Sequence, residues 1–267
     1  MSLFLNPSLP PNPSTFSLTL SNPIVSINYY GVALGFIFCF ILPFAASLFL
    51  VKKYKWSFIL IILGASSFYV AVYLAENLFV YLLKVIYTLL IGSLSKLFYI
   101  CVIGLCPGIF EESARFVAMK FIAKRCVSQK EYKNRKTCLA YGLGHGGFEC
   151  VIGVGLNFLI ILVNSNSLIE QGSLYSDITF VGCLISIWER IFAVLFHISA
   201  SILVFKSIKE NTYIFYIIAI FYHDFIDEFA MFYQLGVIKS IYSTELLISF
   251  FFLNICNWSI LFTFPYE

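Results

Sequence analysis

Long apolar runs separated by short polar segments dominate the pattern along the chain. A helix that crosses a bilayer needs roughly 20 mainly apolar residues. Because the connections are short, the pattern predicts a single all-α transmembrane domain over 29–267, preceded by a short polar tail over 1–28. Seven runs are long enough, near 29–51, 56–83, 95–123, 138–163, 180–205, 212–235 and 244–264.

Composition agrees with a membrane protein and excludes several other classes. Of the 267 residues, 60% are hydrophobic and 12% are charged, whereas average soluble domains have about 45–50% and about 25%. With this composition, the chain has too few polar residues to cover the surface of a soluble globule of its size. The same numbers exclude a disordered chain and a secreted disulfide scaffold, and the net charge of +3 is too small to indicate nucleic acid as a partner. We therefore expect a multi-pass integral membrane protein with lipid as its surroundings, in the plasma membrane or the endoplasmic reticulum.

Basic residues between the runs predict the orientation. Cytoplasmic loops of membrane proteins carry an excess of Lys and Arg. Eleven such residues follow the first, third and fifth runs, and three lie on the opposite side of the membrane. The N-terminus is therefore expected outside and the C-terminus in the cytosol. The basic segment 124–136 belongs to the cytosolic side, where it could also hold anionic lipid.

Ionisable residues inside the predicted spans are the strongest indication of function. A charge at mid-bilayer costs on the order of 2.5–3.5 kcal/mol on insertion scales unless it is paired or hydrated. These residues must therefore face one another, and in spans three to six they fall in one layer between the bilayer centre and the cytosolic side. Glu76, in the second span, stands apart and is expected to be structural or to lie at the lipid interface. The others are Glu111, Glu112, Arg115, His145, Glu149, Glu189, Arg190, His197, His223, Asp224, Asp227 and Glu228.

The third predicted span carries two adjacent carboxylates. Pro107 interrupts this span, so a new helical segment is expected near Ile109. Arg115 follows Glu112 by three residues and Glu111 by four, and it can pair with either. A helix start with a buried ion pair would need only one glutamate. The second carboxylate is then free to act as a base.

Glycines surround a His–Glu pair in the fourth predicted span. The segment 142–149 has the sequence Gly-Leu-Gly-His-Gly-Gly-Phe-Glu. Small residues let membrane helices approach closely, so a packing seam alone would account for the glycines. His145 and Glu149 lie one turn apart on one helix face, as a base or metal ligand and its orienting carboxylate would.

Two more histidines lie in the fifth and sixth predicted spans. Arg190 and His197 are two turns apart on one helix face, and Glu189 is expected to form a structural ion pair with Arg190. His223 and Asp227 are one turn apart, so that the carboxylate can orient the imidazole or act beside it. Both pairs add to the polar layer that the third and fourth spans begin.

In this order, the four motifs resemble a known group of membrane peptidases. They are Glu-Glu-x-x-Arg, Gly-His-Gly-Gly-x-Glu, Arg-x(6)-His and His-x-x-x-Asp, all within 95–235. The set resembles the YhfC family of intramembrane peptidases, which is similar to the PrsW peptidases and to the superfamily of CAAX prenyl endopeptidases and bacteriocin-processing enzymes. The resemblance implies a hydrolase that cleaves a membrane-embedded or lipid-modified peptide in or near the cytosolic leaflet.

The resemblance also implies roles for single residues. Either glutamate of the first motif would be the base that activates water, Arg115 would fix the other glutamate, and His145 would help to hold the water. His223 with Asp227 would stabilise the oxyanion. CAAX endopeptidases have one more residue between the glutamates and the arginine, so the choice of base stays open. The candidate catalytic residues are Glu111, Glu112, Arg115, His145, Glu149, His197, His223 and Asp227.

Metal binding stays open at the level of the sequence. The chain has no His-Glu-x-x-His motif, but His145, His197 and His223 could bind Zn²⁺ from separate helices. The superfamily has been described both as metalloprotease and as metal-independent. We expect metal-independent activation of water, or at most a weakly held metal.

Two other functions fit the same layout. The anterior-pharynx-defective (APH) subunit of gamma-secretase is similar in span number, orientation and length, but it is a scaffold that has lost the paired glutamates. A scaffold with partner membrane subunits is therefore the alternative, and the presence of Glu111, Glu112, His145 and Glu149 favours the enzyme. A proton-coupled transporter would also use buried acids. No internal repeat is visible, however, and the polar residues lie toward one side of the membrane.

Overall fold

A computed structural model describes residues 26–86, 102, 104–132, 134–170 and 177–263. The described residues form helices and no strand, apart from one isolated parallel bridge between Ile27 and Ile178. The all-α expectation is therefore confirmed. Beginning at Tyr29, the helices follow the predicted apolar runs closely, whereas the start of the third run, 95–101, lies outside the described residues.

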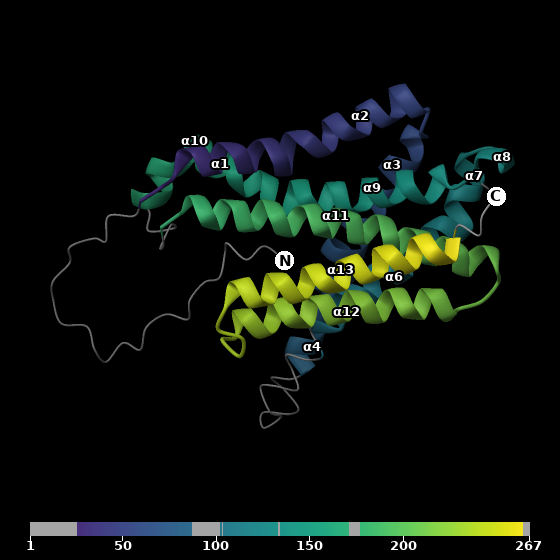
Figure 1. Cartoon of the computed structure of the whole chain (residues 1–267). Coiled ribbons are helices and arrows are strands. Elements are labelled where there is room, and N and C mark those ends of the chain that lie inside the picture. Colours follow the sequence, from purple (N-terminus) through teal and green to yellow (C-terminus); the bar gives the residue numbers. More distant parts are fainter. Residues whose placement is uncertain (1–25, 87–101, 103, 133, 171–176, 264–267) are drawn as a thin grey trace.

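Most of the described helices run along roughly one common direction, whereas the stretch Phe58–Ile86 crosses them at a steep angle (Figure 1). Their bounds are α1 (Tyr29–Phe36), α2 (Leu42–Tyr54), α3 (Phe58–Tyr69), α4 (Asn77–Ile86), α6 (Cys106–Val117), α7 (Lys124–Cys126), α8 (Gln129–Tyr132), α9 (Lys136–Cys150), α10 (Leu156–Glu170), α11 (Phe180–Lys209), α12 (Ile214–Gln234) and α13 (Ile241–Thr263). Short π-helical segments join α1 to α2, α3 to α4, α6 to α7 and α9 to α10 into longer helical stretches.

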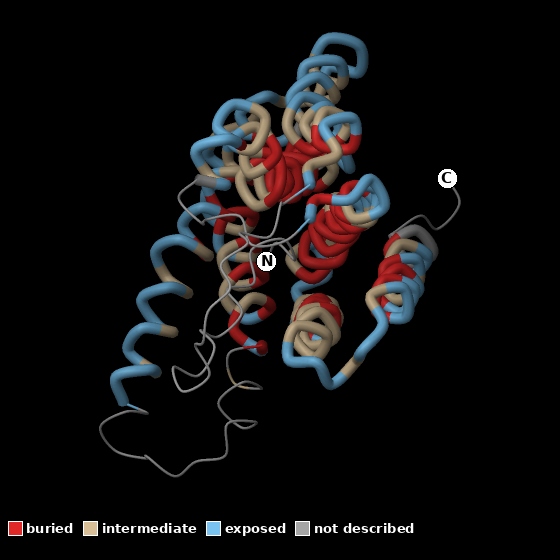
Figure 2. Tube along the Cα trace, turned by 90° about the vertical axis from the view of Figure 1, so that its left-hand side faces the viewer, coloured by how far each residue is buried: buried red, intermediate tan, exposed pale blue. Residues whose placement is uncertain are grey.

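Four of the described stretches are long and apolar enough to cross a membrane. They are Tyr29–Tyr54, Phe58–Ile86, Lys136–Ile169 and Phe180–Lys209. Large hydrophobic side chains cover their outer faces, such as Phe49, Leu78 and Val181. Figure 2 shows this arrangement, with exposed residues on the outside of the bundle and buried residues facing its interior. A protein that spans the membrane several times follows, and the number of seven spans and the orientation stay predictions.

The centre of the bundle is α9, which packs between α3 and α11. Backbones meet there directly, because a Cβ atom on Gly144 would lie 2.0 Å from the carbonyl oxygen of Ile61 on α3. On the other side, a Cβ atom on Gly142 would lie 2.6 Å from the Cα atom of Ile198 on α11. The glycines of α9 therefore form a packing seam, and the same seam brings His145 up against both neighbouring helices.

Replacing Gly144 with alanine is expected to destabilise the protein, by about 1–3 kcal/mol as for other overpacked cores. The methyl group would collide with the backbone of α3, which cannot move aside as a flexible side chain could. Gly147→Ala on the same helix is the matched control, because its Cβ atom would meet only Pro43 at an ordinary 3.5 Å. Thermal unfolding of both variants in lipid checks the difference, and equal stability would contradict the described contact.

Candidate active site

Four of the predicted site residues come together from four helices. Glu111 lies on α6, His145 on α9, His197 on α11 and His223 on α12, and all four are buried. The ring centroids of His145 and His197 are 4.7 Å apart, and those of His197 and His223 are 5.3 Å apart. The predicted convergence of spans three to six on one polar layer is therefore what the structure shows.

Glu112 is held on both sides by basic groups. Its Oε2 lies 3.1 Å from Nε of Arg115, three residues later on the same helix. Its Oε1 accepts a hydrogen bond from Nδ1 of His223 over 2.9 Å. The side chains of Glu112 and Arg115 are fully buried. The arginine therefore pairs with this glutamate rather than with Glu111, and both of its carboxylate oxygens have a structural use.

Glu111 has fewer ties and faces the interior of the site. Its Oε2 lies 2.8 Å from Nε2 of His145 and 4.0 Å from Nε2 of His223. The expected pairing of His145 with Glu149 is wrong, because two residues one turn apart on α9 both point toward neighbouring helices. Glu111 is thus the partner of His145, and it is the less constrained of the two adjacent glutamates.

Glu149 instead joins two basic residues of α11. Its Oε1 accepts from Nη1 of Arg190 over 2.7 Å, and its Oε2 lies 2.5 Å from Nε2 of His197. Arg190 also pairs with Glu189, as predicted. Arg115 donates from Nη2 to Nδ1 of His197 over 2.9 Å. Because a guanidinium only donates, Nδ1 is the acceptor and the ring proton of a neutral His197 lies on Nε2, directed at Glu149.

On α12, Asp227 and two further acids lie around His223. Oδ2 of Asp227 is 3.6 Å from Nε2 of His223, which agrees with the predicted one-turn pairing, although Glu112 is the closer partner of that imidazole. Asp224 faces Gly108 of α6, and Glu228 faces Gly104, two residues before α6 begins; a Cβ atom on these glycines would lie 2.0 Å and 2.4 Å from the respective carboxylate oxygens. These two acids therefore occupy space that the glycines leave open.

A cavity of about 400 Å³ opens onto the cluster. The predicted site residues that line it are Glu111, Glu149, His197, His223 and Asp227. It continues past Gly104 to Gln234, at the end of α12 that the orientation prediction places outside. Glu76 lines the same cavity, so the expectation that it stands apart is wrong. The cavity is polar at the cluster and has apolar walls that include Phe68, Phe196 and Phe252.

Three donors around the cavity fit a metal ion in kind. Ligand atoms of Glu111, His197 and His223 lie within 4.8 Å of one another, and all three residues are buried. Two imidazoles and one carboxylate are a donor set of catalytic zinc sites. Nδ1 of His223 donates to Glu112 and leaves Nε2 for a ligand, which is the usual carboxylate support of a metal-binding histidine. His145, a metal candidate by sequence, lies outside this set and contacts Glu111 instead.

At His197 a metal would compete with a proton. Its Nε2 carries that proton toward Glu149 as long as Arg115 donates to Nδ1. Binding of a metal through Nε2 therefore requires the proton to leave, and Glu149 is the carboxylate beside it. Release of protons is the general cost of metal binding by histidine.

Polar neighbours of the histidines extend the site beyond the motifs. Nη1 of Arg115 donates to the backbone oxygen of His197 over 2.6 Å and to Oγ of Ser201 over 2.8 Å. Ser201 follows His197 by one helical turn, and that spacing could have identified it. Oγ of Ser67 lies 3.4 Å from Nδ1 of His145. Ser67 belongs to a separate helix, α3, so no spacing in the sequence relates it to His145.

One buried acid on α13 was also not singled out by sequence. Glu245 is 6% exposed, and within the described residues neither of its carboxylate oxygens has a hydrogen-bond partner. It lies at the start of the last predicted span, where a single acid is ordinarily assigned to the membrane surface. It does not line the cavity at the cluster.

Comparisons with known proteins show the family of the chain. The model of the YhfC intramembrane metalloprotease family matches residues 38–248. The chain is also 28% identical over 240 residues to a protein of Bacillus subtilis (strain 168) named uncharacterized membrane protein YhfC. The aligned region covers 82% of this chain and 90% of that protein. No solved structure matches. Because the family match spans most of the chain and includes all four motifs, the chain belongs to the YhfC intramembrane metalloprotease family.

Proposed function

We propose that this protein is an intramembrane peptidase in which Glu111 activates the attacking water. The observation that carries the proposal is the difference between the two adjacent glutamates. Glu112 is tied to Arg115 and His223, whereas Glu111 lines the cavity and has one short contact, to His145. A base must reach water in the cavity and have a free lone pair, and Glu111 meets both requirements.

The surrounding residues have matching parts in this proposal. His145 holds the carboxylate of Glu111 through Nε2 and fixes its position against the cavity. Without a metal, a protonated His223 would donate from Nδ1 to Glu112 and from Nε2 to the developing oxyanion of a substrate carbonyl. Glu149 and Arg115 hold His197 from both of its ring nitrogens. The substrate would be a membrane-embedded or lipid-modified peptide, which suits the apolar walls of the cavity.

The family also implies a metal, and the residues present could hold it. Glu111, His197 and His223 would be its ligands. Once bound, the metal supplies a Lewis acid and a water of low pKa. Glu111 would then hold the metal rather than take the proton. Among the other carboxylates that line the cavity, Asp227 lies 3.6 Å from Nε2 of His223 and would be the one to accept the proton of the water.

If Glu111, His197 and His223 hold a metal, the purified protein retains about one Zn²⁺ per chain, and His223→Gln weakens zinc binding at least ~10-fold. The variant lacks the imidazole of His223, whose Nε2 would bind the metal while Nδ1 contacts Glu112. Elemental analysis after dialysis against a graded chelator checks this expectation. Glu245→Gln is the control, since it changes a buried acid that does not line the cavity. Equal zinc content in both variants would count against this ligand set.

A cleavage assay tests the proposed activity itself. The full chain, reconstituted in lipid, would be offered pooled transmembrane peptides and prenylated peptides, with and without chelator, and the products read by mass spectrometry. Cleavage supports a peptidase, and loss of cleavage with chelator supports a metal. A folded protein that cleaves no peptide of a broad pool would favour the scaffold alternative instead, and a search for partner subunits would follow.

A further inference from the structure

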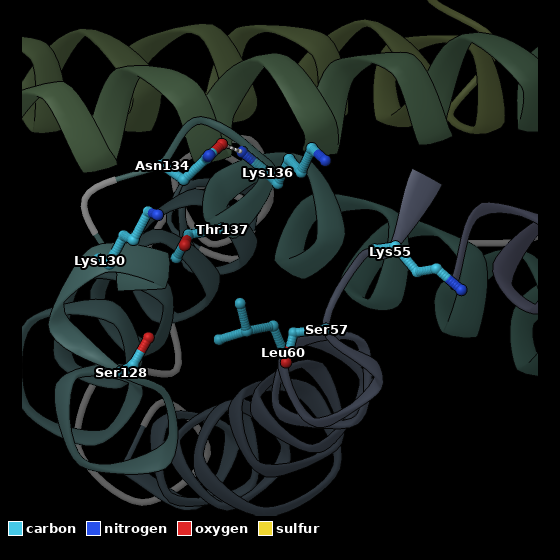
Figure 3. Close-up of a pocket in the computed structure, with 8 residues that line it drawn as sticks. All are labelled: Lys55, Ser57, Leu60, Ser128, Lys130, Asn134, Lys136 and Thr137. Carbon is cyan, nitrogen blue, oxygen red and sulfur yellow. Dashed lines mark hydrogen bonds between the residues drawn. The ribbon is translucent and has the colours of Figure 1, made fainter. Parts of the chain in front are cut away.

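A second cavity lies at the end of the bundle where the basic segments meet (Figure 3). It measures about 230 Å³ and shares no lining residue with the cavity at the cluster. Two connections build it, one between α2 and α3 and one that leads from α7 through α8 to α9. The lining residues are Lys55, Ser57, Leu60, Ser128, Lys130, Asn134, Lys136 and Thr137.

The fold fixes the two connections against each other. Lys55 has a left-handed backbone (φ 56°) and ends α2, so that the chain turns back into α3. Nζ of Lys136 donates to the backbone oxygen of Tyr54 over 2.8 Å, across the two connections. Leu60 and Thr137 are almost fully buried at the base of the cavity. The cavity is therefore a built feature rather than a gap between loose loops.

The lining has a strong positive charge and many hydrogen-bond donors. Three of the eight lining residues are lysines, none is acidic, and three carry hydroxyl groups. Ser57 is the N-cap residue of α3, but its side chain makes no capping hydrogen bond. The first N–H groups of a helix have no acceptor within the helix, so those of α3 can donate to a ligand. These donors and the positive end of the helix dipole favour an anion at this place.

Figure 3 shows the lysines at the rim of the cavity rather than inside it. Lys130 lies on one side near Asn134, Lys55 lies on the opposite side, and the ammonium groups of Lys55 and Lys136 point outward. A lysine ammonium sits on a flexible four-carbon stem, so rotation of Lys55 and Lys130 brings their ammonium groups over a bound anion, while Lys136 keeps its contact with Tyr54 and adds positive charge nearby. The hydroxyl groups and the start of α3 would then contact the anion from below.

We propose that this cavity binds a phosphate group, supplied by the headgroup of an anionic lipid or by a soluble phosphate. Phosphate is the anion that lysines, hydroxyls and a helix start recognise together. The location suits a lipid source, because Tyr54 and Trp56 are the sequence neighbours of the lining residue Lys55, and such aromatic residues gather at the membrane interface. Basic pockets at the cytosolic ends of spans bind lipid headgroups. The site is separate from the proposed catalytic cluster and does not depend on catalysis.

Binding to the full chain in detergent tests the proposal. The probes are short-chain phosphatidic acid, phosphatidylcholine with the same chains, and inorganic phosphate. Native mass spectrometry counts bound lipid, and thermal unfolding measures stabilisation by inorganic phosphate. We expect phosphatidic acid to bind in preference to phosphatidylcholine. Stabilisation by inorganic phosphate as well would indicate recognition of the phosphate group alone, and its lack would indicate a lipid headgroup. Preference for neither phosphatidic acid nor inorganic phosphate would overturn the proposal.

A matched pair of triple variants separates the cavity from the general surface charge. Lys55→Gln/Lys130→Gln/Lys136→Gln is expected to weaken binding of phosphatidic acid by at least ~10-fold, as three lost lysine contacts predict. The control is the same change at three lysines that do not line the cavity, Lys52, Lys53 and Lys124. Equal losses in the two triple variants would reduce the effect to surface charge and overturn the proposal.

The triple variant loses the contact between Lys136 and Tyr54, which could itself destabilise the protein. A second pair of variants leaves this contact in place. Asp and Asn are equally good N-caps, so Ser57→Asp and Ser57→Asn both support the start of α3. Only the aspartate places a negative charge at the cavity. We therefore expect Ser57→Asp to lose binding of phosphatidic acid by at least ~10-fold relative to Ser57→Asn, with the same unfolding temperature. Equal binding by the two variants would contradict a phosphate at this position.

Discussion

Glu111→Gln is expected to lower kcat/KM by about 100-fold to 10,000-fold, the range that loss of a general base or acid produces. The amide has nearly the shape of the carboxylate but cannot take a proton from water. Folding should be little affected, because Glu111 has a single short contact and no arginine depends on it. The measurement is the rate of cleavage of a peptide selected from the pooled screen, beside thermal unfolding in the same lipid.

The neighbouring Glu112→Gln variant makes this prediction specific. Removal of one charge from a buried pair costs about 3–5 kcal/mol, and Glu112 is the buried partner of Arg115. We therefore expect Glu112→Gln to be the less stable of the two variants and Glu111→Gln to be the less active one per folded molecule. Activity like that of the unmodified protein in both variants, or an identical pattern of losses, would contradict the assigned roles.

The metal content of Glu111→Gln separates two roles of this residue. Activity is lost in either case, whether Glu111 takes the proton or holds a metal. If Glu111 is only the base, the variant keeps its zinc. If Glu111 is a ligand, zinc falls together with activity, as in His223→Gln. The same preparation used for the kinetics answers this, because elemental analysis needs no substrate.

Much of the site follows from the sequence, because a membrane makes unpaired charge costly. Glu112 and Arg115 lie three residues apart on one helix, and the structure pairs them as this spacing allows. The meeting of the histidines on one level follows from their depth in the predicted spans. Neither inference needs the helices to have a particular rotation. Both inferences therefore hold whichever way the helices are rotated against one another.

The partners of His145 and Glu149 depend on rotation, and sequence reasoning assigned them wrongly. Side chains one turn apart share a face of α9, but both extend outward to whatever lies opposite. The glycine seam sets α9 against α3 and α11, and in that arrangement Glu111 of α6 meets His145 while α11 meets Glu149. Such contacts between distant segments leave no periodic signal in the sequence.

The position of Glu76 depends on a local irregularity. A π-helical segment spans Val70–Glu76, and one extra residue in a turn rotates the following side chains by roughly 100°. A regular helix through the second predicted span would therefore turn this acid toward a different direction. The structure places it on the wall of the cavity beside Glu111.

Arg115→Met is expected to destabilise the protein by about 3–5 kcal/mol, the cost of leaving a buried charge without its partner. Arg115 is fully buried and contacts three residues at once, namely the carboxylate of Glu112, Nδ1 and the backbone oxygen of His197, and Oγ of Ser201. Methionine fills much of the space but donates no hydrogen bond. Unfolding of the variant in lipid, compared with Arg125→Met at the exposed end of α7, measures the effect.

A double-mutant cycle tests whether the charge pair is the cause. In Arg115→Met/Glu112→Gln neither charge remains, so the double variant should lose less stability than the two single changes added together, by about 1–3 kcal/mol. Strictly additive losses would mean that Arg115 acts mainly through His197. In that case His197 in Arg115→Met would be free to move its proton from Nε2 to Nδ1, because no guanidinium faces that nitrogen. Nitrogen chemical shifts of the imidazole would report this change of tautomer, which loss of the charge pair alone would not produce.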